Sequence, residues 1–552
     1  MLGAPSMVGL TVGALGYCAA LTPSLLPRPL MFLLLLTALG TLVGYAIGTT
    51  GWWALRKVPA VGRRQAPRFV RFGVPVVVWL IALAFTPVAV AWQSDQQTAL
   101  DMPATLPGTV TLIVMTALIC FGLLLLARLV RLGTNALARL ICRIGPIKGW
   151  VSRQQPSNVH RSIAAVRAVV AVCIIVLAIL GLQLGMSALV ATYDNVNADT
   201  TGQTPTNLGQ NSGSVGSLAP WDTLGREGRF YVTNTMTLAT IGQITGRPAQ
   251  TPTRVYVGMQ QGDTPAARTD LALRELDRVG AWDRKFLTIY AATGTGWVNP
   301  VGINSIEAVT GGDVTTVAVQ YSAVPSWIGF VLDPQTAQEQ NRSTVNAIVD
   351  AWRTKPVDHR PELVLFGESL GSFGSQSAWD AGDSANQVTS AVSKIIWIGP
   401  PAESVLWSTW QADRTSGPAW QPVIGDGLIA KVYINPSELN TAIPADGAAI
   451  TFVAHPNDPV VYWSPDLLLS KPDWLVPPLG PGVAPEMQWY PVITYLQVGM
   501  DLISGGEPPE VGHNYSANIG QAVAITINPD GWTKDDTARL QQALPSLTYE
   551  TG

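Results

Sequence analysis

The chain has 552 residues, of which 47% are hydrophobic and only 13% are charged, and its net charge is −3. A chain of this length divides into more than one unit, and the low charged fraction predicts a membrane portion. Residues 1–190 carry fifteen Lys and Arg against two acids, a net of +13, whereas residues 191–552 carry nineteen against thirty-five, a net of −16. The acidic second part makes nucleic acid an unsuitable partner.

The first part contains five apolar segments, at about residues 8–26, 30–55, 69–92, 107–127 and 168–190. Each approaches the ~20 residues that cross a ~30 Å hydrocarbon layer, although Pro23 and Pro27 interrupt the first. We therefore expect an α-helical membrane domain of about five transmembrane helices over residues 1–193, with the lipid bilayer as its partner. Because no charged residue or histidine lies in the middle of a segment, we expect an anchor. A lipid-presenting groove between helices and a transport function stay open.

The charges of the connecting loops predict the orientation in the membrane. Six Lys or Arg and no acid lie between the second and third segments, and eight and no acid lie between the fourth and fifth. The loop after the third segment instead carries Asp95 and Asp101. The positive-inside rule places the two basic loops and the amino terminus in the cytoplasm. Everything after about residue 190 is then expected outside the cytoplasmic (inner) membrane.

Residues 191–552 differ from the first part in composition and in the pattern of apolar residues. Residues 194–220 are rich in Asn, Thr, Gly, Ser and Gln, which predicts an exposed linker. From residue 221 onward, short apolar runs alternate with helical patterns at 265–279, 335–353 and 371–380. This alternation predicts a mostly parallel sheet with helices on both faces, in a domain spanning residues 221–552. The expected strands are Phe230–Val232, Arg254–Gly258, Phe286–Ala292, Val314–Tyr321, Leu363–Phe366, Ile395–Ile398, Lys431–Ile434 and Ala449–Ala454.

One stretch of this domain carries a chemical signature. The apolar run Leu363–Phe366 is followed by Gly-Glu-Ser-Leu-Gly at residues 367–371, and then by small residues suited to a tightly packed helix. A strand, a tight turn and a helix around G-x-S-x-G are the context of the nucleophile elbow of an α/β-hydrolase. The sequence therefore predicts Ser369 as a nucleophile exposed at the end of the sheet.

A serine nucleophile needs a base and an orienting acid, which follow it in the order acid, then histidine, in this fold. Asp458 stands in the turn after the strand Ala449–Ala454, and His513 is the only histidine after that turn. We expect Asp458 and His513 to complete a catalytic triad with Ser369. His455 precedes the acid in the same loop, and we expect it to be structural. Between acid and base, where a last strand belongs, the sequence reads as a helix or a long insertion.

The oxyanion of an acyl-transfer reaction needs preorganised N–H donors. We expect one from the backbone of Leu370 and a second from the glycine-rich loop after Phe286–Ala292, at Thr295 or its neighbours. That loop is not a dinucleotide site, because Asn299 stands where the third glycine is required. All four cysteines lie in residues 1–190 and the whole chain has four histidines. We accordingly expect no metal and no cofactor.

Several motifs together resemble a known family, the actinobacterial membrane α/β-hydrolases with an amino-terminal transmembrane domain. The resemblance spans nearly the whole chain and rests on Trp221–Gly225, Thr293–Trp297, Gln320–Ser322 with Pro325–Trp327, Phe366–Gly374, Trp397–Pro401, Asn457–Pro459 and Gly512–Tyr515. It implies a hydrolase-type fold behind a membrane anchor, with Ser369, Asp458 and His513 matching the expected triad. It supplies no secure substrate.

These patterns lead us to expect a membrane-anchored serine hydrolase of the esterase, lipase or thioesterase type that acts on lipidic or envelope esters. Trp463, Trp474 and Trp489 lie in a proline-rich segment between acid and base, where exposed aromatic side chains would suit an acyl chain or the membrane face. Two alternatives stay open. The same triad would serve acyl transfer to an envelope acceptor, and a non-catalytic domain would serve binding or assembly in the envelope.

Overall fold

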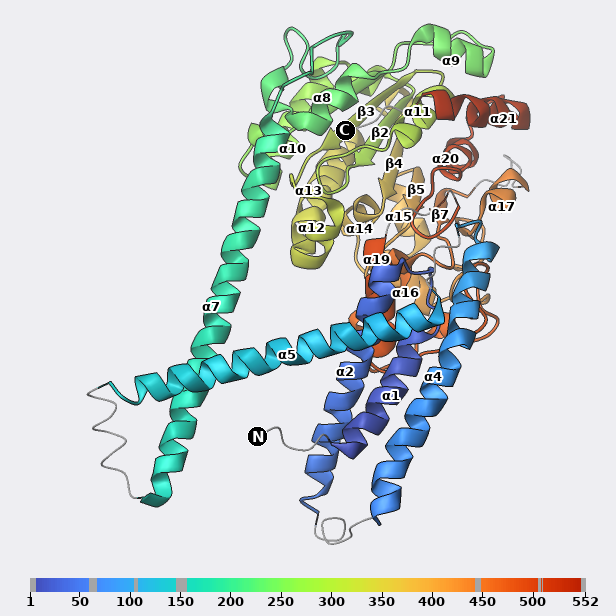
Figure 1. The fold of residues 1–552 in the computed structure, drawn as a ribbon. Coiled ribbons are helices and arrows are strands. Elements are labelled where there is room, and N and C mark those ends of the chain that lie inside the picture. Colours follow the sequence, from blue (N-terminus) through green and yellow to red (C-terminus); the bar gives the residue numbers. More distant parts are fainter. Residues whose placement is uncertain are drawn as a thin grey trace. The chain divides into compact units, whose positions relative to one another are not determined.

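The computed structural model describes residues 6–58, 67–103, 108–144, 156–441, 448–504, 508 and 510–547. The chain forms two compact units (Figure 1). Unit 1 comprises Met1–Leu21, Pro29–Val90 and Thr105–Thr192. Unit 2 comprises Thr22–Arg28, Ala91–Ala104 and Tyr193–Gly552.

Unit 1 is helical. Its elements are α1 (Met7–Leu21), α2 (Leu30–Leu55), most of α4 (Arg68–Ala99), α5 (Thr109–Ile141) and most of α7 (Pro156–Ala198). All of these except α1 are long and apolar enough to cross a membrane, which gives four candidate spans among the described residues and not the five expected. At 15 residues, α1 is about 22 Å long, shorter than the hydrocarbon layer. It ends at Leu21 because Pro23 and Pro27 follow.

Glycines let α1 and α2 pack closely. A Cβ atom on Gly16 would lie 2.2 Å from the carbonyl oxygen of Gly40, and one on Gly44 would lie 2.5 Å from that of Val12. Any side chain at either glycine would push the helices apart. Small residues at such contacts are typical of helices that pack within a membrane, where close van der Waals contact replaces the hydrophobic effect.

Unit 2 is built on a parallel sheet of seven strands in the order β1-β3-β2-β4-β5-β7-β6. The strands are β1 (Thr253–Val257), β2 (Phe286–Ala291), β3 (Val314–Val319), β4 (Glu362–Glu368), β5 (Lys394–Ile398), β6 (Ala430–Tyr433) and β7 (Ile450–Val453). Seven of the eight expected strands are therefore confirmed. The expected mostly parallel sheet is confirmed as well.

The two faces of the sheet bury two separate cores, as the alternation of side chains along a strand requires. In β4, Leu363 and Leu365 belong to one core, whereas Val364 and Phe366 belong to the other. A strand buried on both faces needs apolar residues at every position, which explains the continuous apolar run in the sequence.

Helices cover both faces (Figure 1). The first core is completed by α10 (Pro265–Arg278), α13 (Pro334–Arg353), α15 (Ala385–Ala391), α16 (Val405–Ala412) and α19 (Ile493–Ser504). The second is completed by α8 (Gly225–Thr233), α9 (Leu238–Thr245), α11 (Pro300–Val309), α17 (Pro436–Thr441), α20 (Ile519–Ile527) and α21 (Lys534–Ala543). Val461 and Tyr462 of the short helix α18 (Pro459–Tyr462) also lie in the first core, and the unit further contains α12 (Ser326–Leu332) and α14 (Leu370–Gln376).

The prediction of a strand at Phe230–Val232 is wrong, because these residues lie in α8. The β-forming preference of Phe-Tyr-Val yields to tertiary packing. Tyr231 and Val232 are buried in the second core, and the ring of Tyr231 packs against Tyr256 of β1 with centroids 5.6 Å apart.

The segment expected to be an exposed linker is partly buried. Helix α7 continues to Ala198, and further on Asn211 and Ser212 are buried beside β1. The Arg254 N–H donates to Asn211 Oδ1 at 2.8 Å, and the Tyr256 N–H donates to Ser212 Oγ at 3.0 Å. The segment thus covers the outer edge of β1, which would otherwise expose unpaired backbone groups.

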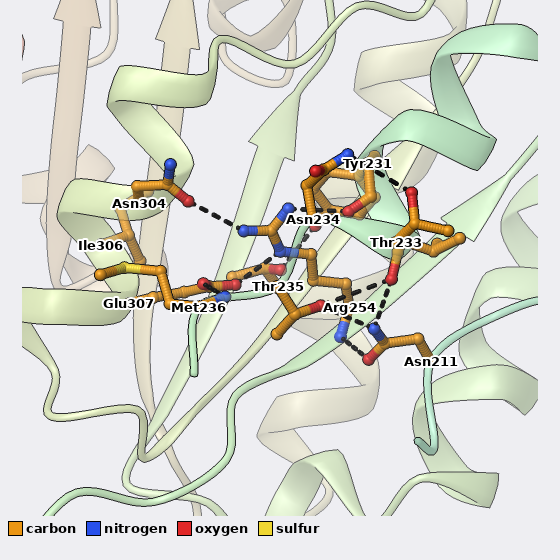
Figure 2. A network of polar contacts seen from close by, with 12 residues as sticks. Asn211, Tyr231, Thr233, Asn234, Thr235, Met236, Arg254, Asn304, Ile306 and Glu307 are labelled. Carbon is orange, nitrogen blue, oxygen red and sulfur yellow. Dashed lines mark hydrogen bonds and ion pairs between the residues drawn. The ribbon is translucent and has the colours of Figure 1, made fainter. Parts of the chain in front are cut away.

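A buried polar network centred on Arg254 joins β1 to its neighbours (Figure 2). The Arg254 guanidinium donates to Glu307 Oε1 at 2.6 Å, to the Tyr231 carbonyl at 2.7 Å and to Asn304 Oδ1 at 3.1 Å. Both members of the Arg254–Glu307 ion pair are fully buried. Since an isolated buried charge is costly, the many partners explain how this pair is accommodated between β1, α8 and α11.

In the part of the chain that the structure describes, the edge of the sheet near β7 lacks the last strand that an α/β-hydrolase places between the acid and the histidine. Among the described residues between Asp458 and His513 there are helices and turns and no strand. The edge position is instead occupied by β6, which precedes β7 in the sequence and pairs with it in parallel. The expectation of a helix or insertion before His513 is confirmed by α19.

Candidate active site

Ser369 occupies the turn between β4 and α14, with φ 53° and ψ −121°. This left-handed backbone is strained for a residue with a side chain. Crowding explains the flanking glycines. A Cβ atom on Gly371 would lie 2.1 Å from the Ala291 carbonyl oxygen, and one on Gly367 would lie 2.8 Å from the Gly371 carbonyl oxygen. The expected strand, tight turn and helix are present.

Asp458 and His513 meet at the same end of the sheet. Asp458 follows β7 as the N-cap of α18, and its Oδ1 accepts from the Val460 N–H at 2.8 Å. His513 Nδ1 donates to Asp458 Oδ2 at 2.7 Å across 55 positions of sequence. Asp458 is fully buried, whereas 26% of the His513 side chain is exposed. An imidazole held in this way presents its Nε2 away from the carboxylate.

Ser369 and His513 flank the same peptide of β5. The Ser369 N–H donates to the Ile398 carbonyl at 2.8 Å. A Cβ atom on Gly399 would lie 2.7 Å from His513 Cε1, the ring carbon between the two nitrogens. Gly399 has φ 53°, so both its conformation and its contact with the imidazole favour glycine. Ser369 and His513 therefore both lie at the carboxyl end of β5.

The electrostatics of Asp458 suit an orienting carboxylate. Burial alone would raise its pKa, but the nearby His513 and the hydrogen bonds from His513, Tyr515 and Val460 outweigh burial and lower the pKa below its usual 3.8. Asp458 therefore stays ionised at neutral pH and favours a positive charge on His513.

Two residues around this pair were assigned no catalytic role from the sequence. The Tyr515 hydroxyl donates to Asp458 Oδ2 at 2.6 Å and accepts from the His455 N–H at 3.0 Å. The buried His455 ring stacks on Tyr515 with centroids 4.1 Å apart, and its Nδ1 bonds the Gly512 carbonyl at 2.9 Å. The position of Tyr515, two residues after His513, is the sequence signal that could have indicated its contact with Asp458. The structural role of His455 was expected.

The loop after β2 lies beside the elbow, since Gly371 packs against Ala291. Gln320 Nε2 donates to the Thr295 carbonyl at 2.7 Å, and the Tyr256 hydroxyl donates to the Gly296 carbonyl at 2.8 Å. The Gly296 N–H donates back to the Thr293 carbonyl at 2.7 Å. These bonds fix the turn that contains Thr295, one of the two expected oxyanion donors. The other, Leu370, begins α14, where an N–H group has no partner within the helix.

A second buried carboxyl adjoins the nucleophile. Glu368 precedes Ser369, and its Oε2 accepts from Asn299 Nδ2 at 2.8 Å. Burial raises the pKa of Glu368, while the Asn299 hydrogen bond and the charge of His513 act in the opposite direction. Asn299 also caps α11 by accepting from the Val301 N–H at 2.9 Å. Neither Glu368 nor Asn299 is given a catalytic role by the sequence pattern.

Aromatic rings line up from the elbow toward α19. Phe373, one turn after Ser369, lies 6.3 Å from Phe330 between ring centroids, and Phe330 lies 6.2 Å from Trp463. Trp463 in turn lies 5.2 Å from Tyr495. Phe330 also packs against a small cluster of buried side chains formed by Tyr321, Ala337 and Leu370. We call Phe330, Phe373, Trp463 and Tyr495 the aromatic row.

The expectation of exposed tryptophans in the proline-rich segment is wrong. Trp474 is buried, and Trp463 and Trp489 are partly buried against the first core. The indole N–H groups of Trp463 and Trp489 donate to the carbonyls of Tyr495 and Leu467. Packing against α19 and these bonds explain why they turn inward. The exposed apolar residues of this segment are Leu469 and Val476.

A cavity of about 580 Å³ lies at the amino end of β1, lined by residues that include Asn211, Thr235, Thr253 and Arg284. Ser369 follows the carboxyl end of β4, and all strands are parallel, so this cavity is at the opposite end of the sheet. It is not part of the site around Ser369. In the described part of the chain, no three His, Cys, Asp or Glu residues are grouped so as to hold a metal ion.

A parallel sheet with a strained serine at a strand-to-helix turn defines the α/β-hydrolase class. The chain belongs to the alpha/beta-hydrolase family: residues 253–540 match the family's model, and residues 21–235 match the model of its N-terminal part. Neither curated proteins nor solved structures gave a match.

Proposed function

We propose that this protein is a membrane-anchored serine hydrolase that cleaves lipidic or envelope esters outside the cytoplasmic membrane. The observation that carries the proposal is the 2.7 Å hydrogen bond between His513 and Asp458, beside a serine in the strained elbow conformation. A serine, a histidine and an aspartate in this chain order are the groups that acyl transfer through an acyl-enzyme requires.

In the proposed acylation step, the Ser369 hydroxyl oxygen attacks the ester carbonyl carbon while His513 Nε2 takes the hydroxyl proton. The N–H groups of Leu370 and Thr295 stabilise the resulting oxyanion. When the tetrahedral intermediate collapses, His513 returns the proton to the departing alcohol oxygen and the acyl group stays on Ser369. In deacylation, His513 takes a proton from water as the water oxygen attacks the acyl carbon. The bond between that carbon and Ser369 Oγ then breaks, the carboxylic acid leaves, and His513 returns the proton to Ser369. Asp458 stays ionised throughout and stabilises the imidazolium.

The aromatic row supports an apolar acyl group as the substrate's recognised part. Phe373 follows Ser369 by one helical turn, and the row continues from it through Phe330 to Trp463. Apolar contact area next to a reacting carbonyl favours fatty acyl chains over polar ones.

A fluorophosphonate probe tests the chemistry directly, because Ser369 attack forms an oxygen–phosphorus bond and releases fluoride. We expect the wild type to be labelled and Ser369→Ala to remain unlabelled, with His513→Ala at least about 10³-fold slower. A wild type that resists the probe would contradict the proposal. Products formed from an acyl ester with and without a sugar acceptor then distinguish hydrolysis from acyl transfer.

The outside location is supported by the basic loops of the first half, and cysteine labelling tests it. All four native cysteines lie in residues 1–190, so they can be replaced by alanine before a single cysteine is introduced. Val357, which is 73% exposed, provides a position in unit 2, and the exposed Lys57 provides one in a basic loop. In intact cells, a membrane-impermeant maleimide should label Val357→Cys and spare Lys57→Cys. The reverse pattern would overturn the orientation.

A further inference from the structure

Most of the loop between α1 and α2 belongs to unit 2, although both helices belong to unit 1. This part of the loop is Thr22–Arg28. Leu25 is fully buried in the first core of the sheet, the same core that contains Val498 of α19. A leucine buried completely in this core contributes roughly 2 kcal/mol of apolar transfer free energy. The loop is therefore built into the hydrolase unit.

Polar contacts hold the loop against one face of α19. Gln497 and Asp501 are four residues apart and so lie on the same face of the helix. Gln497 Nε2 donates to the Thr22 carbonyl at 3.0 Å, and Asp501 Oδ2 accepts from the Leu26 N–H at 3.3 Å. Arg28 Nε lies 3.4 Å from Asp501 Oδ1, and both side chains are completely buried. A buried ion pair with several hydrogen bonds fixes geometry, because either charge alone would be costly.

A second segment of the first half of the chain also contacts the Thr22–Arg28 loop. It is Ala91–Ala104, which also belongs to unit 2. Gln96 Nε2 donates to the Ser24 carbonyl at 2.8 Å and so reaches the Thr22–Arg28 loop. Farther on, Leu100 packs with Leu26 and Val511 in a small apolar cluster of buried side chains. We call Leu26, Leu100 and Val511 the support cluster.

Val511 of the support cluster precedes His513 by two residues. The opposite side of the His513 loop is held by polar bonds, since the Gly512 N–H donates to Asn457 Oδ1 at 3.2 Å and the Gly512 carbonyl bonds His455 Nδ1. Within this cluster of described residues, the apolar contacts of Val511 come from the first half of the chain. Removal of those contacts frees the loop on one side while Asp458 continues to hold the imidazole.

We propose that Leu26 and Leu100 are positioning residues for His513, so that the two short segments of the first half complete the catalytic unit. The proposal rests on the proposed function, because it assigns His513 the role of base. A base displaced by about 1 Å loses roughly 10²-fold in rate even when all catalytic groups are present. A chain that begins at the linker lacks both segments and therefore lacks this support.

The test uses the full chain and the variants Leu26→Ala and Leu100→Ala, with Leu469→Ala, 80% exposed, as a matched control. Fluorophosphonate inactivation is measured against probe concentration. We expect the maximal rate to fall at least about 10-fold in both variants, with the half-saturating concentration unchanged. Leu100→Met should restore most of the rate, because it refills the volume. A purely structural role would lower the labelled fraction and leave the rate of the folded fraction unchanged, which overturns the proposal.

Hydrogen–deuterium exchange of residues 510–515 gives a readout that does not depend on the chemistry. We expect faster exchange there in Leu26→Ala and Leu100→Ala than in the wild type and in Leu469→Ala. Unchanged exchange in both variants overturns the support of the loop. If the wild type resists the probe while the variants loosen residues 510–515, the proposed function fails and the contact itself stands.

Discussion

Tyr515 and His513 donate to the same oxygen of Asp458. The hydroxyl of Tyr515 lies 2.6 Å from Asp458 Oδ2, and His513 Nδ1 lies 2.7 Å from it. The other oxygen, Oδ1, accepts from the backbone of Val460. Three donors from two segments thus satisfy one fully buried carboxylate, which keeps it ionised and fixed in orientation.

Replacement of Tyr515 by phenylalanine removes one of these donors without creating a large cavity. Since a hydrogen bond to a charged group contributes about 1.5–3 kcal/mol, we expect the maximal rate of ester hydrolysis to fall at least about 10-fold. The Michaelis constant should change little, because the Tyr515 side chain is buried and its hydroxyl bonds Asp458. Steady-state kinetics with a fatty acyl ester check this, and a rise in the Michaelis constant alone would contradict it.

The lowered pKa of Asp458 predicts a pH dependence of stability. The folded state binds the proton less readily than the unfolded state, whose pKa is about 3.8, so the ionised carboxylate stabilises the fold above that pH. This stabilisation is lost as the pH falls through the lower pKa of the folded state. The difference in unfolding free energy between the wild type and Asp458→Asn should therefore be constant near neutrality and shrink below pH 3.8. Denaturant unfolding at several pH values measures it, and a difference that widens in acid would count against the assignment.

Gln320 fixes the loop expected to supply the second oxyanion donor. Its Nε2 donates to Thr295 at 2.7 Å and to Asn197 at 3.0 Å, and its Oε1 accepts from Met259. We expect Gln320→Ala to lower the maximal rate of hydrolysis about 10-fold, because a misplaced oxyanion donor loses much of its effect. Gln320→Glu should not restore the rate, since a carboxylate cannot donate to the Thr295 carbonyl. Full activity in Gln320→Ala would show that the loop does not depend on this bond.

Gly371 tests the packing of the elbow. In Gly371→Ala the new methyl group would lie 2.1 Å from the Ala291 carbonyl oxygen, so the backbone must move. We expect the free energy of unfolding to fall by about 1–3 kcal/mol, with loss of probe labelling at Ser369. Gly382→Ala gives a matched control, because Gly382 is exposed and a methyl group there would meet no other atom within 4 Å. Equal melting temperatures for the two variants would contradict the crowding argument.

The buried pair of Arg28 and Asp501 should behave as a unit. Loss of one partner leaves an uncompensated buried charge, so we expect Arg28→Met and Asp501→Leu each to lower the free energy of unfolding by about 3–5 kcal/mol. The double variant should be more stable than either single variant, because no charge remains. Thermal unfolding of the wild type, the two single variants and the double variant in detergent measures this coupling as a double-mutant cycle. Additive losses in the double variant would mean that the two side chains are not coupled.

The local pattern of the chain was sufficient to predict most of the sheet and the elbow. Continuous apolar runs identify strands buried on both faces, and Gly-Glu-Ser-Leu-Gly identifies the strained turn at Ser369, because both depend on steric rules that act within a few residues. The strand predicted at Phe230–Val232 failed for the complementary reason. These residues are helical because Tyr231 packs against Tyr256, and local residue preferences do not predict such a distant contact.

Sequence by itself thus determined the parallel sheet, the apolar helices and the order of Ser369, Asp458 and His513 along the chain. Only the tertiary structure decided that Tyr515 shares Asp458 with His513, and that Leu26 and Leu100 pack beside the His513 loop. The physical reason is separation: these contacts join residues tens to hundreds of positions apart, and their geometry follows from how the whole core closes. Continuous apolar runs and the steric demands of glycine positions depend on neighbouring residues alone, so the sequence predicts them.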